Sequence, residues 1–166
     1  MIYTCDITEG EFQLRCYVRE GALVGCAFLP HYDGKYEARM KQFFHDDIAP
    51  GDTPALRRMA QWLDGYFQGK NMPIPIPVQP WGTSFQLAVY RRLMEIPYGH
   101  TASYRDIAQS LSLTAYRAVG SAVGKNPIVI VVPCHRILQH GGGLGGFSAP
   151  GGVETKRFLL HLEGVL

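Results

Sequence analysis

Apolar residues recur in short runs along the first thirty residues and at helical spacing after them. Residues 1–7, 12–18 and 22–29 resemble strands, and Glu9-Gly10 and Glu20-Gly21 between them are typical of turns. The pattern predicts three short strands joined by tight turns, and therefore a small antiparallel sheet at the start of the chain.

Two helices are expected after these strands. Residues 35–48 place four apolar side chains on one side: Tyr36, Met40, Phe43 and Phe44. Thr53-Pro54 is typical of a helix start, because threonine caps a helix and proline suits its first position. The helix it opens should end at Gly69, after apolar residues at helical spacing: Leu56, Met59, Ala60, Leu63 and Phe67.

Proline divides the chain near its middle. The segment from Asn71 to Pro80 holds four prolines in ten residues, which excludes a helix interior and favours an extended linker. We therefore predict an N-terminal α/β domain over residues 1–78, with the linker at about 71–80, and a second domain over residues 79–166.

The second half carries two capping boxes, at Thr83–Gln86 and Ser103–Asp106. The first predicts a helix ended by Pro97-Tyr98-Gly99, with these residues facing inward: Phe85, Val89, Leu93 and Ile96. The second predicts a short helix with Ile107, Ala108 and Leu111 on one face, followed by a helix over residues 115–124 with Thr114 as its N-cap. Two short helices across a brief turn form a helix-turn-helix. The expected fold class is α+β, with an antiparallel sheet and helices first and a mainly helical half after them.

The predicted helix over residues 115–124 contains Gly120 and Gly124, each of which costs about 1 kcal/mol relative to alanine. Close approach of the backbone to another surface would offset that cost. Val119 and Val123 are expected to face the core, which leaves a surface of small residues: Ala118, Ser121 and Ala122. Such a slim helix suits a DNA minor groove, but it equally suits close packing against another helix, and the helix alone does not decide between them.

The apolar run of residues 128–132 predicts a buried strand that delivers Cys134 to a loop. His135 and Arg136 follow the cysteine directly. Neighbouring cations favour the thiolate, which is the nucleophilic form of cysteine. A helix is expected from about Val153 to Glu163, with Glu163 on the same inward face as Leu159 and Leu160. A carboxylate on a mostly buried face, at a helix C-terminus where it opposes the dipole, requires a partner.

Pro-Cys-His-Arg at 133–136, with Arg-Ala-Val-Gly at 117–120 and Asn-Pro at 126–127, resembles the O6-alkylguanine-DNA alkyltransferases, also called methylated-DNA–protein-cysteine methyltransferases. The resemblance runs from about Trp81 to Gly164. The first half resembles the family only in length and coarse pattern.

The resemblance implies roles for individual residues. Cys134 would accept the alkyl group, His135 would take its proton through a water, and Glu163 would orient His135. Asn126 would brace the segment before the cysteine, and Tyr104 would contact the base and help protonate it.

The resemblance also implies that Arg117 enters the duplex where a nucleotide is flipped out, beside Ala118, Ser121 and Tyr104 on the DNA-facing surface. The base pocket would be lined by Tyr104, Ile137, Phe147 and Ser148, with the glycine-rich segment 141–148 as one wall. Residues 149–152 add about two residues relative to the best-known members, and many of these have tyrosine at the position of Phe147.

Charge and composition fit this interpretation. The net charge of +2 divides into −2 over residues 1–78 and +4 over residues 79–166, and a mild positive charge suits weak attraction to phosphate. The sequence shows neither an apolar membrane span nor a signal peptide, so we expect an intracellular protein, cytoplasmic in a prokaryote or nuclear in a eukaryote. We also expect a monomer. Cys5, Cys16 and Cys26 have no recognisable zinc spacing; we expect no metal and no cofactor, although some family members hold zinc in this half.

The expected function is irreversible transfer of an alkyl group from O6-alkylguanine in double-stranded DNA to Cys134. One alternative is a non-catalytic protein that binds alkylated DNA, but such alkyltransferase-like proteins lack the cysteine. The other alternative is a cysteine hydrolase or a redox enzyme. This function would leave the helix-turn-helix unexplained, and the sequence contains no Cys-x-x-Cys motif.

Overall fold

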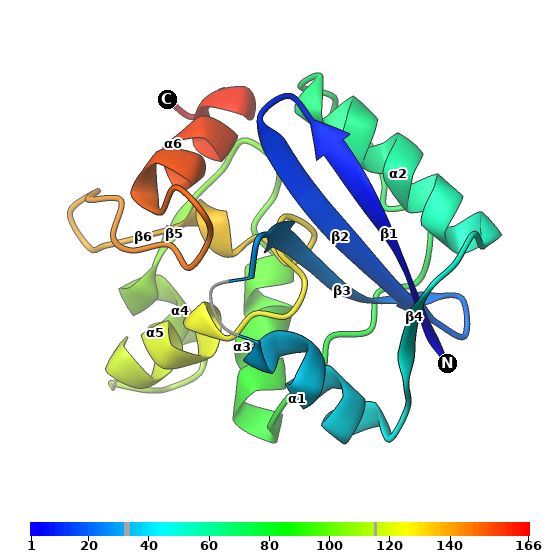
Figure 1. Cartoon of the computed structure of the whole chain (residues 1–166). Coiled ribbons are helices and arrows are strands. Elements are labelled where there is room, and N and C mark those ends of the chain that lie inside the picture. The colour runs from blue at the N-terminus through cyan, green and yellow to red at the C-terminus, as the bar shows by residue number, and fades with distance from the viewer. Residues whose placement is uncertain (32–33, 115) are drawn as a thin grey trace.

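The computed structural model describes residues 1–31, 34–114 and 116–166. Its first half is built on a sheet of four strands, β1 (Ile2–Glu9), β2 (Phe12–Arg19), β3 (Ala22–Leu29) and β4 (Ile48–Pro50), in the order β3-β2-β1-β4 (Figure 1). The three predicted strands are confirmed and pair antiparallel. The short β4, which the sequence pattern did not predict, pairs parallel to β1.

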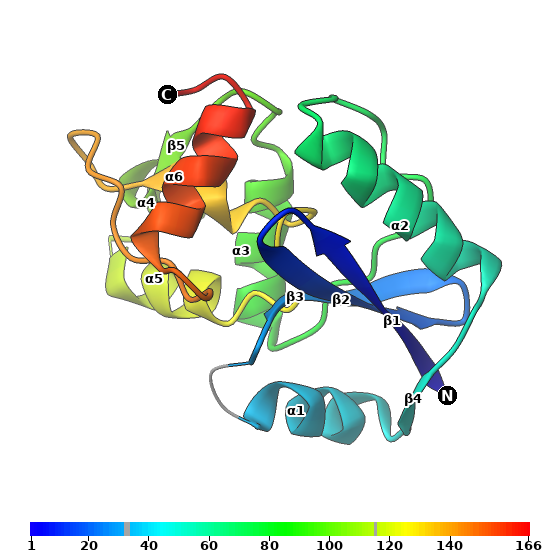
Figure 2. The ribbon, with the colours of Figure 1, turned by 45° about the horizontal axis from the view of Figure 1, so that its top comes forward.

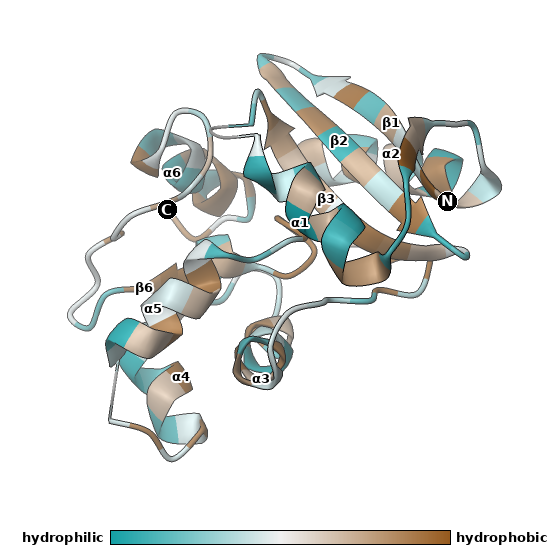
Figure 3. Cartoon of the chain, turned by 60° about the horizontal axis from the view of Figure 1, so that its bottom comes forward, coloured by the Kyte–Doolittle hydropathy of each residue, from teal (hydrophilic) through white to brown (hydrophobic). Residues whose placement is uncertain are grey.

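Both faces of this sheet are covered, which explains why apolar residues are frequent in its strands. Helix α1 (Lys35–Phe44) lies on one side and α2 (Pro54–Phe67) on the other, as Figure 2 shows. Polar and apolar bands nevertheless alternate along β1 and β2 (Figure 3), because neighbouring side chains of a strand point to opposite faces.

Helix α1 is shorter than the sequence pattern predicted. The prediction of helix to residue 48 is wrong, because His45 takes a left-handed backbone conformation with φ of 51° and residues from Ile48 join the sheet. Helix α2 begins as predicted: the Thr53 side chain accepts a hydrogen bond from the backbone N–H of Leu56. Gly69, with φ of 83°, lies just beyond its end.

The proline-rich segment is extended, as predicted, but it is not a free linker. Leu23 in β3 donates its backbone N–H to Pro77 at 2.8 Å and accepts one from Gln79 at 2.8 Å. Trp81 then donates its indole N–H to the Val24 carbonyl at 2.7 Å. The segment therefore lies along the edge of β3 and fixes where the second half begins.

The second half contains α3 (Ser84–Met94), β5 (Ala102–Ser103), α4 (Tyr104–Ser110), α5 (Tyr116–Gly124), the 3-10 helix η1 (Cys134–Arg136), β6 (Ile137–Leu138) and α6 (Val153–Leu162). Both predicted capping boxes are formed. Phe85 is an exception to the predicted inward face of α3, since its side chain is exposed. Helices α4 and α5 form the expected pair, although Ala115, the predicted first residue of α5, lies outside the described residues.

The predicted strand over residues 128–132 is wrong. Ile128 makes a single bridge to Cys26 of β3, and the chain then turns through Ile130, whose φ is 69°. The Val132 N–H donates to the Ile128 carbonyl at 2.9 Å, so the run folds back on itself. It is buried, as its composition requires, but as a compact turn against β3.

One hydrophobic core joins the two halves of the chain. Its buried members come from β2, α2, α3, α5 and α6 as well as from the turn before Cys134, and include Leu14, Leu63, Val89, Val119, Ile128 and Leu159. The division at residue 78 stays a prediction, since this core is continuous across it. No helix among the described residues is long and apolar enough to cross a membrane.

Gly25 gives a test of the packing between β3 and α1. A Cβ atom there would lie 2.6 Å from the Tyr36 hydroxyl and 2.7 Å from Met40 Cε. We expect Gly25→Ala to lower the free energy of unfolding by about 1–3 kcal/mol, because the core would be overpacked. Urea denaturation measures the change. Gly34→Ala is the control, because its Cβ would meet no atom within 4 Å and should cost about 0.5 kcal/mol or less. Equal losses in both variants would contradict this account of the interface.

Candidate active site

Cys134 begins η1 and lines a cavity of about 260 Å³. The cavity is formed by segments far apart in the sequence: Tyr104 of α4, Gly120, Val123 and Gly124 of α5, Asn126, Val129 and the 146–148 segment. Only 6% of Cys134 is exposed, so its sulfur is reached through this cavity and not from an open surface. The structure thus brings together five residues that the sequence had named: Tyr104, Asn126, Cys134, Phe147 and Ser148.

The electrostatic setting of Cys134 differs from the one inferred from its sequence neighbours. Burial raises the pKa of its thiol, opposed by a hydrogen bond from the Asn126 side chain and by the positive charge of Lys156. Arg136, which the sequence placed near the cysteine, points instead to Glu163. The resting sulfur is therefore a neutral thiol that requires proton removal before it can act as a nucleophile.

His135 and Glu163 form a fully buried pair. His135 Nε2 lies 2.6 Å from Glu163 Oε2, and neither side chain has exposed surface. Burial lowers the pKa of His135 although Glu163 opposes the shift. The imidazole is consequently neutral near pH 7, and with its proton assigned to Nε2, where Glu163 accepts it, Nδ1 is left as a base.

The Nδ1 atom of His135 is buried and has no hydrogen-bond partner among the described residues. Buried polar atoms are normally satisfied, so an unpartnered one next to a cysteine marks a position where a proton can be received. This atom suits the role in proton transfer that the resemblance implied for His135.

Glu163 follows the last residue of α6, where a carboxylate opposes the helix dipole. Hydrogen-bond donors around the carboxylate stabilise its negative charge. Oε1 accepts from Arg136 Nε at 2.8 Å and from the Gly99 N–H at 3.2 Å. Oε2 accepts from the Tyr66 hydroxyl at 2.6 Å, from His135 at 2.6 Å and from Arg136 Nη2 at 3.2 Å. Burial alone would raise the pKa of Glu163, but the hydrogen bonds from His135, Arg136 and Tyr66 outweigh it and hold the pKa at about 2.

Asn126 braces the turn that precedes the cysteine. Its Nδ2 donates to the Val132 carbonyl at 2.7 Å, and its Oδ1 accepts the Ile128 N–H at 3.0 Å. The two bonds close the turn from both ends. This arrangement agrees with the bracing role expected for Asn126.

The sequence analysis missed Lys156, on α6. It is fully buried, and its ammonium donates to the carbonyls of Ile137 and Leu144. Burial lowers the pKa of Lys156 to about 8, opposed by its interaction with Cys134. Lys156 thus links α6 to β6 and to the glycine-rich segment. The available signal would have been its position one helical turn before Leu159 and Leu160, on the predicted inward face.

Tyr66 was missed as well, because it lies on α2 in the half without motifs. Its hydroxyl donates to Glu163 Oε2 and its oxygen lies 3.3 Å from His135 Nε2. The sequence placed Tyr66 on a helix but gave no signal for this contact.

A second cavity, of about 420 Å³, adjoins the first through three shared residues, Tyr104, Gly120 and Gly146. Arg117 lines it, together with Tyr116, Arg105 and His140. Ala118 and Ser121 are exposed, as predicted, but Ala122 is buried, which corrects its assignment to the exposed surface.

The glycines of α5 are not required by packing within the chain. A Cβ at Gly120 would come no closer than 3.9 Å to Tyr104, and a Cβ at Gly124 no closer than 3.9 Å to Ser148. These are ordinary contact distances, so close helix–helix packing does not explain the two glycines. Both line the Cys134 cavity and keep it open.

The walls of the cavity differ from the expected set at one position. Phe147 and Ser148 line it, and Ser148 is exposed. Ile137 does not line it: the residue is fully buried, pairs with Ala102 across β5 and β6, and its carbonyl accepts from Lys156. Ile137 is therefore a core residue and not a wall of the cavity.

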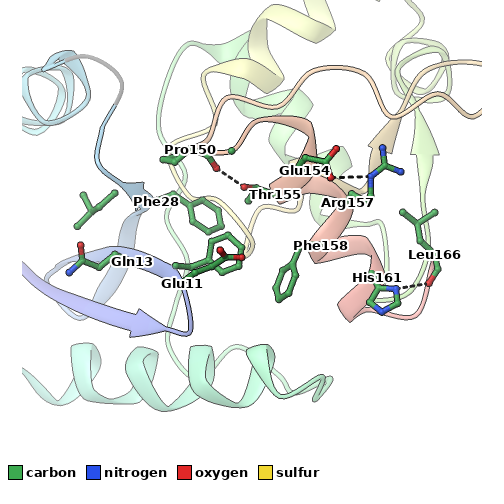
Figure 4. Close-up of a pocket in the computed structure, with 13 residues that line it drawn as sticks. Glu11, Gln13, Phe28, Pro150, Glu154, Thr155, Arg157, Phe158, His161 and Leu166 are labelled. Carbon is green, nitrogen blue, oxygen red and sulfur yellow. Dashed lines mark hydrogen bonds and ion pairs between the residues drawn. The ribbon is translucent and has the colours of Figure 1, made fainter.

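A larger cavity lies elsewhere. It measures about 740 Å³ and lies between the β1–β2 hairpin, the end of β3 and α6, with Phe28 and Phe158 in its walls (Figure 4). Its lining contains none of the site residues predicted from the sequence. Several of its polar side chains pair with close neighbours, such as Thr155 with Pro150 and Glu154 with Arg157. Volume alone thus does not identify the reactive centre.

Cys5, Cys16 and Cys26 lie side by side across β1, β2 and β3. Within residues 1–31, 34–114 and 116–166, no group of three or more Cys, His, Asp or Glu is arranged to hold a metal ion.

Comparison with known proteins agrees with this geometry. Residues 84–165 match the family model described as "6-O-methylguanine DNA methyltransferase, DNA binding domain". The chain is 47% identical over 121 residues to the inducible methylated-DNA–protein-cysteine methyltransferase of Bacillus subtilis (strain 168), covering 72% of this chain and 66% of the relative. It is 45% identical over 108 residues to the methylated-DNA–protein-cysteine methyltransferase of Methanosarcina barkeri, covering 64% of this chain and 67% of the relative. The matches thus span about two thirds of the curated relatives' length.

Solved structures extend the similarity to the first half. The crystal structure of Mycobacterium tuberculosis O6-methylguanine methyltransferase has a TM-score of 0.81 at 34% identity, covering 98% of this chain and 93% of that one. Mycobacterium tuberculosis OGT in complex with DNA gives a TM-score of 0.78 at 33% identity, with coverage of 98% and 91%. Sequence, fold and the Cys134 site agree, and the chain belongs to the O6-methylguanine DNA methyltransferase family.

Proposed function

We propose that this protein repairs double-stranded DNA by moving an alkyl group from O6 of guanine to Sγ of its own Cys134. The observation that supports this most directly is a buried cysteine at the end of a small cavity, beside a His135–Glu163 pair with a free Nδ1. Segments of a single chain are sufficient to form the cavity, and we propose that the protein acts as a monomer.

The proton steps follow from the charges of the site. The thiol proton of Cys134 passes through a water to His135 Nδ1, and Glu163 balances the imidazolium that forms. The sulfur then forms a bond to the alkyl carbon while the bond between that carbon and O6 breaks. The electron pair of the broken bond stays on guanine, which takes a proton from the Tyr104 hydroxyl; the phenolate then regains a proton from solvent as His135 releases to solvent the one it took from Cys134. Burial, and next the proximity of Cys134, raise the pKa of Tyr104, so the phenol holds its proton until the base leaves.

The base can reach the sulfur only if it leaves the duplex. Arg117 would occupy the vacated position in the stack, while the small exposed residues Ala118 and Ser121 would allow α5 to approach the DNA backbone. Tyr104, Phe147 and Ser148 would then enclose the extruded base. A non-catalytic binding protein is not favoured, because it would have no use for Cys134 at the end of the cavity.

Stoichiometry tests the proposed reaction. An S-alkyl cysteine is a thioether that water does not cleave at neutral pH, so each molecule should act once. With excess O6-methylguanine DNA, intact-mass measurement should show a burst that stops at about one methyl per chain, on the peptide that contains Cys134. Cys134→Ser should yield no adduct yet still bind the lesion. Sustained turnover, or an adduct on Cys5, Cys16 or Cys26, would refute the proposal.

Arg117→Ala tests the extrusion step. We expect at least about a tenfold slower reaction with duplex DNA and little change with free O6-benzylguanine, because the free base requires no extrusion. Single-turnover rates on both substrates measure the difference. Arg57→Ala on α2 is a matched control, since Arg57 is an exposed arginine remote from the cavity. Equal slowing on both substrates would exclude the extrusion role of Arg117.

The pH dependence tests the proton relay. Because burial lowers the pKa of His135, its neutral form should persist below the usual midpoint of 6.5. The single-turnover rate should therefore decline only as the pH falls below 6.5, and not on the way down from pH 8. Rates at saturating DNA across this range provide the measurement. A decline centred above 6.5 would contradict the assignment of neutral His135 as the base.

A further inference from the structure

We propose that Tyr66, from the N-terminal half, is a positioning residue for alkyl transfer: its hydroxyl holds Glu163 Oε2 against His135. This inference rests on the proposed function and extends its machinery beyond residues 84–165, which the family model matches. It assigns the first half a part in the reaction.

The contact is short, buried and directional. Tyr66 is 1% exposed, and its hydroxyl donates to Glu163 Oε2 at 2.6 Å across a sequence separation of 97 residues. A carboxylate can only accept, so the phenol proton must point at this oxygen. Burial, and next the charge of Glu163, raise the pKa of Tyr66, so the donor stays protonated throughout the neutral range.

The ring of Tyr66 is held on several sides, which makes the hydroxyl a fixed point. It stacks on Trp62 at 5.5 Å and meets Phe67 at 5.6 Å and Tyr98 at 6.3 Å edge-on. Trp62 is itself fixed, because its indole donates to the Met72 carbonyl at 3.0 Å. The hydroxyl therefore lies where α2 and the aromatic cluster place it.

Tyr66 and His135 share one carboxylate oxygen. Without Tyr66, Oε2 would keep His135 and only the longer 3.2 Å contact from Arg136 Nη2, while Oε1 would still be held by Arg136 Nε and Gly99. The carboxylate could then rotate about its last bond and carry the imidazole, still paired with Oε2, out of its present orientation. Tyr66 thus keeps the histidine in the ring orientation that leaves Nδ1 free.

The shared oxygen also gives Tyr66 a measurable electrostatic effect. By donating to Oε2, the hydroxyl draws negative charge away from His135; its loss should favour the imidazolium and raise the pKa of the imidazole. The other titratable or charged groups that face the pair are Arg136 of η1, Lys156 of α6, Cys134 and Tyr98, and all remain in a Tyr66 variant.

Tyr66→Phe removes one oxygen and keeps the ring contacts, so the variant should fold. Tyr17→Phe is the matched control, because Tyr17 is also fully buried in the N-terminal half and donates to the Glu37 carboxylate, remote from Cys134. Both variants lose a tyrosine hydrogen bond to a carboxylate, buried for Tyr66 and part-buried for Tyr17, and the melting temperature should fall in both.

The reaction should separate the two variants. With Tyr66→Phe we expect a single-turnover rate at saturating DNA that falls on the order of tenfold at pH 7, with unchanged affinity for the DNA. The acid limb of the rate should move to higher pH, and part of the loss should be recovered above pH 8. The rate and pH profile of Tyr17→Phe should match those of the parent.

An NMR titration of His135 in the free protein tests the same contact without any reaction. Its midpoint should rise in Tyr66→Phe and stay at the parental value in Tyr17→Phe. A parental rate and midpoint in Tyr66→Phe, or equal slowing in Tyr17→Phe, would overturn the proposal. If the parent itself forms no adduct, the proposed function fails, while the titration still decides whether Tyr66 controls the pair.

Discussion

The buried carboxylate of Glu163 is the interaction on which the arrangement of this protein depends. An isolated charge in such a place would cost several kcal/mol, and it is retained only where donors surround it. Here the donors are Tyr66 of α2, Gly99 in the turn after α3, and two residues of η1, His135 and Arg136. The two halves of the chain can satisfy this charge only in one relative orientation.

Burial and hydrogen bonding together set the protonation states of the reactive centre. Glu163 stays ionised because its pKa is held at about 2, below the usual 4.5. It therefore contributes stability that is complete above pH 4.5 and is lost as the pH falls through 2. Cys134 and His135, by contrast, are kept neutral by burial. A neutral thiol is a weak nucleophile, and in the mechanism that we propose the relay ionises it when a base occupies the cavity.

The same burial explains the contrast between the two ends of the cavity. Its inner end, at Cys134, is held by the hydrogen bonds of Asn126, of Lys156 and of the His135–Glu163 pair. Its outer end opens between Tyr104, Gly120 and Gly146 toward the surface of α5. Small residues at this opening leave room for a base and a DNA backbone, whereas the inner end tolerates little displacement of the sulfur.

The sequence by itself determined the elements that depend on the spacing of residues close together in the chain. Three strands, two capping boxes, the start of α2 and the helix pair follow from patterns a few residues long, and the motif around Cys134 identified most of the site. Contacts between distant segments were decided only by the tertiary structure. Residues 128–132 are as apolar as a strand, yet they turn because Asn126 and β3 offer their backbone other partners. Ile137 and Ala122 are both buried in the core. Strand β4 forms because Ile48 and the residues after it pair with β1 from Ile2 onward. Lys156 and Tyr66 look ordinary in sequence; what they do depends on carbonyls and a carboxylate that folding brings to them from up to 97 residues away.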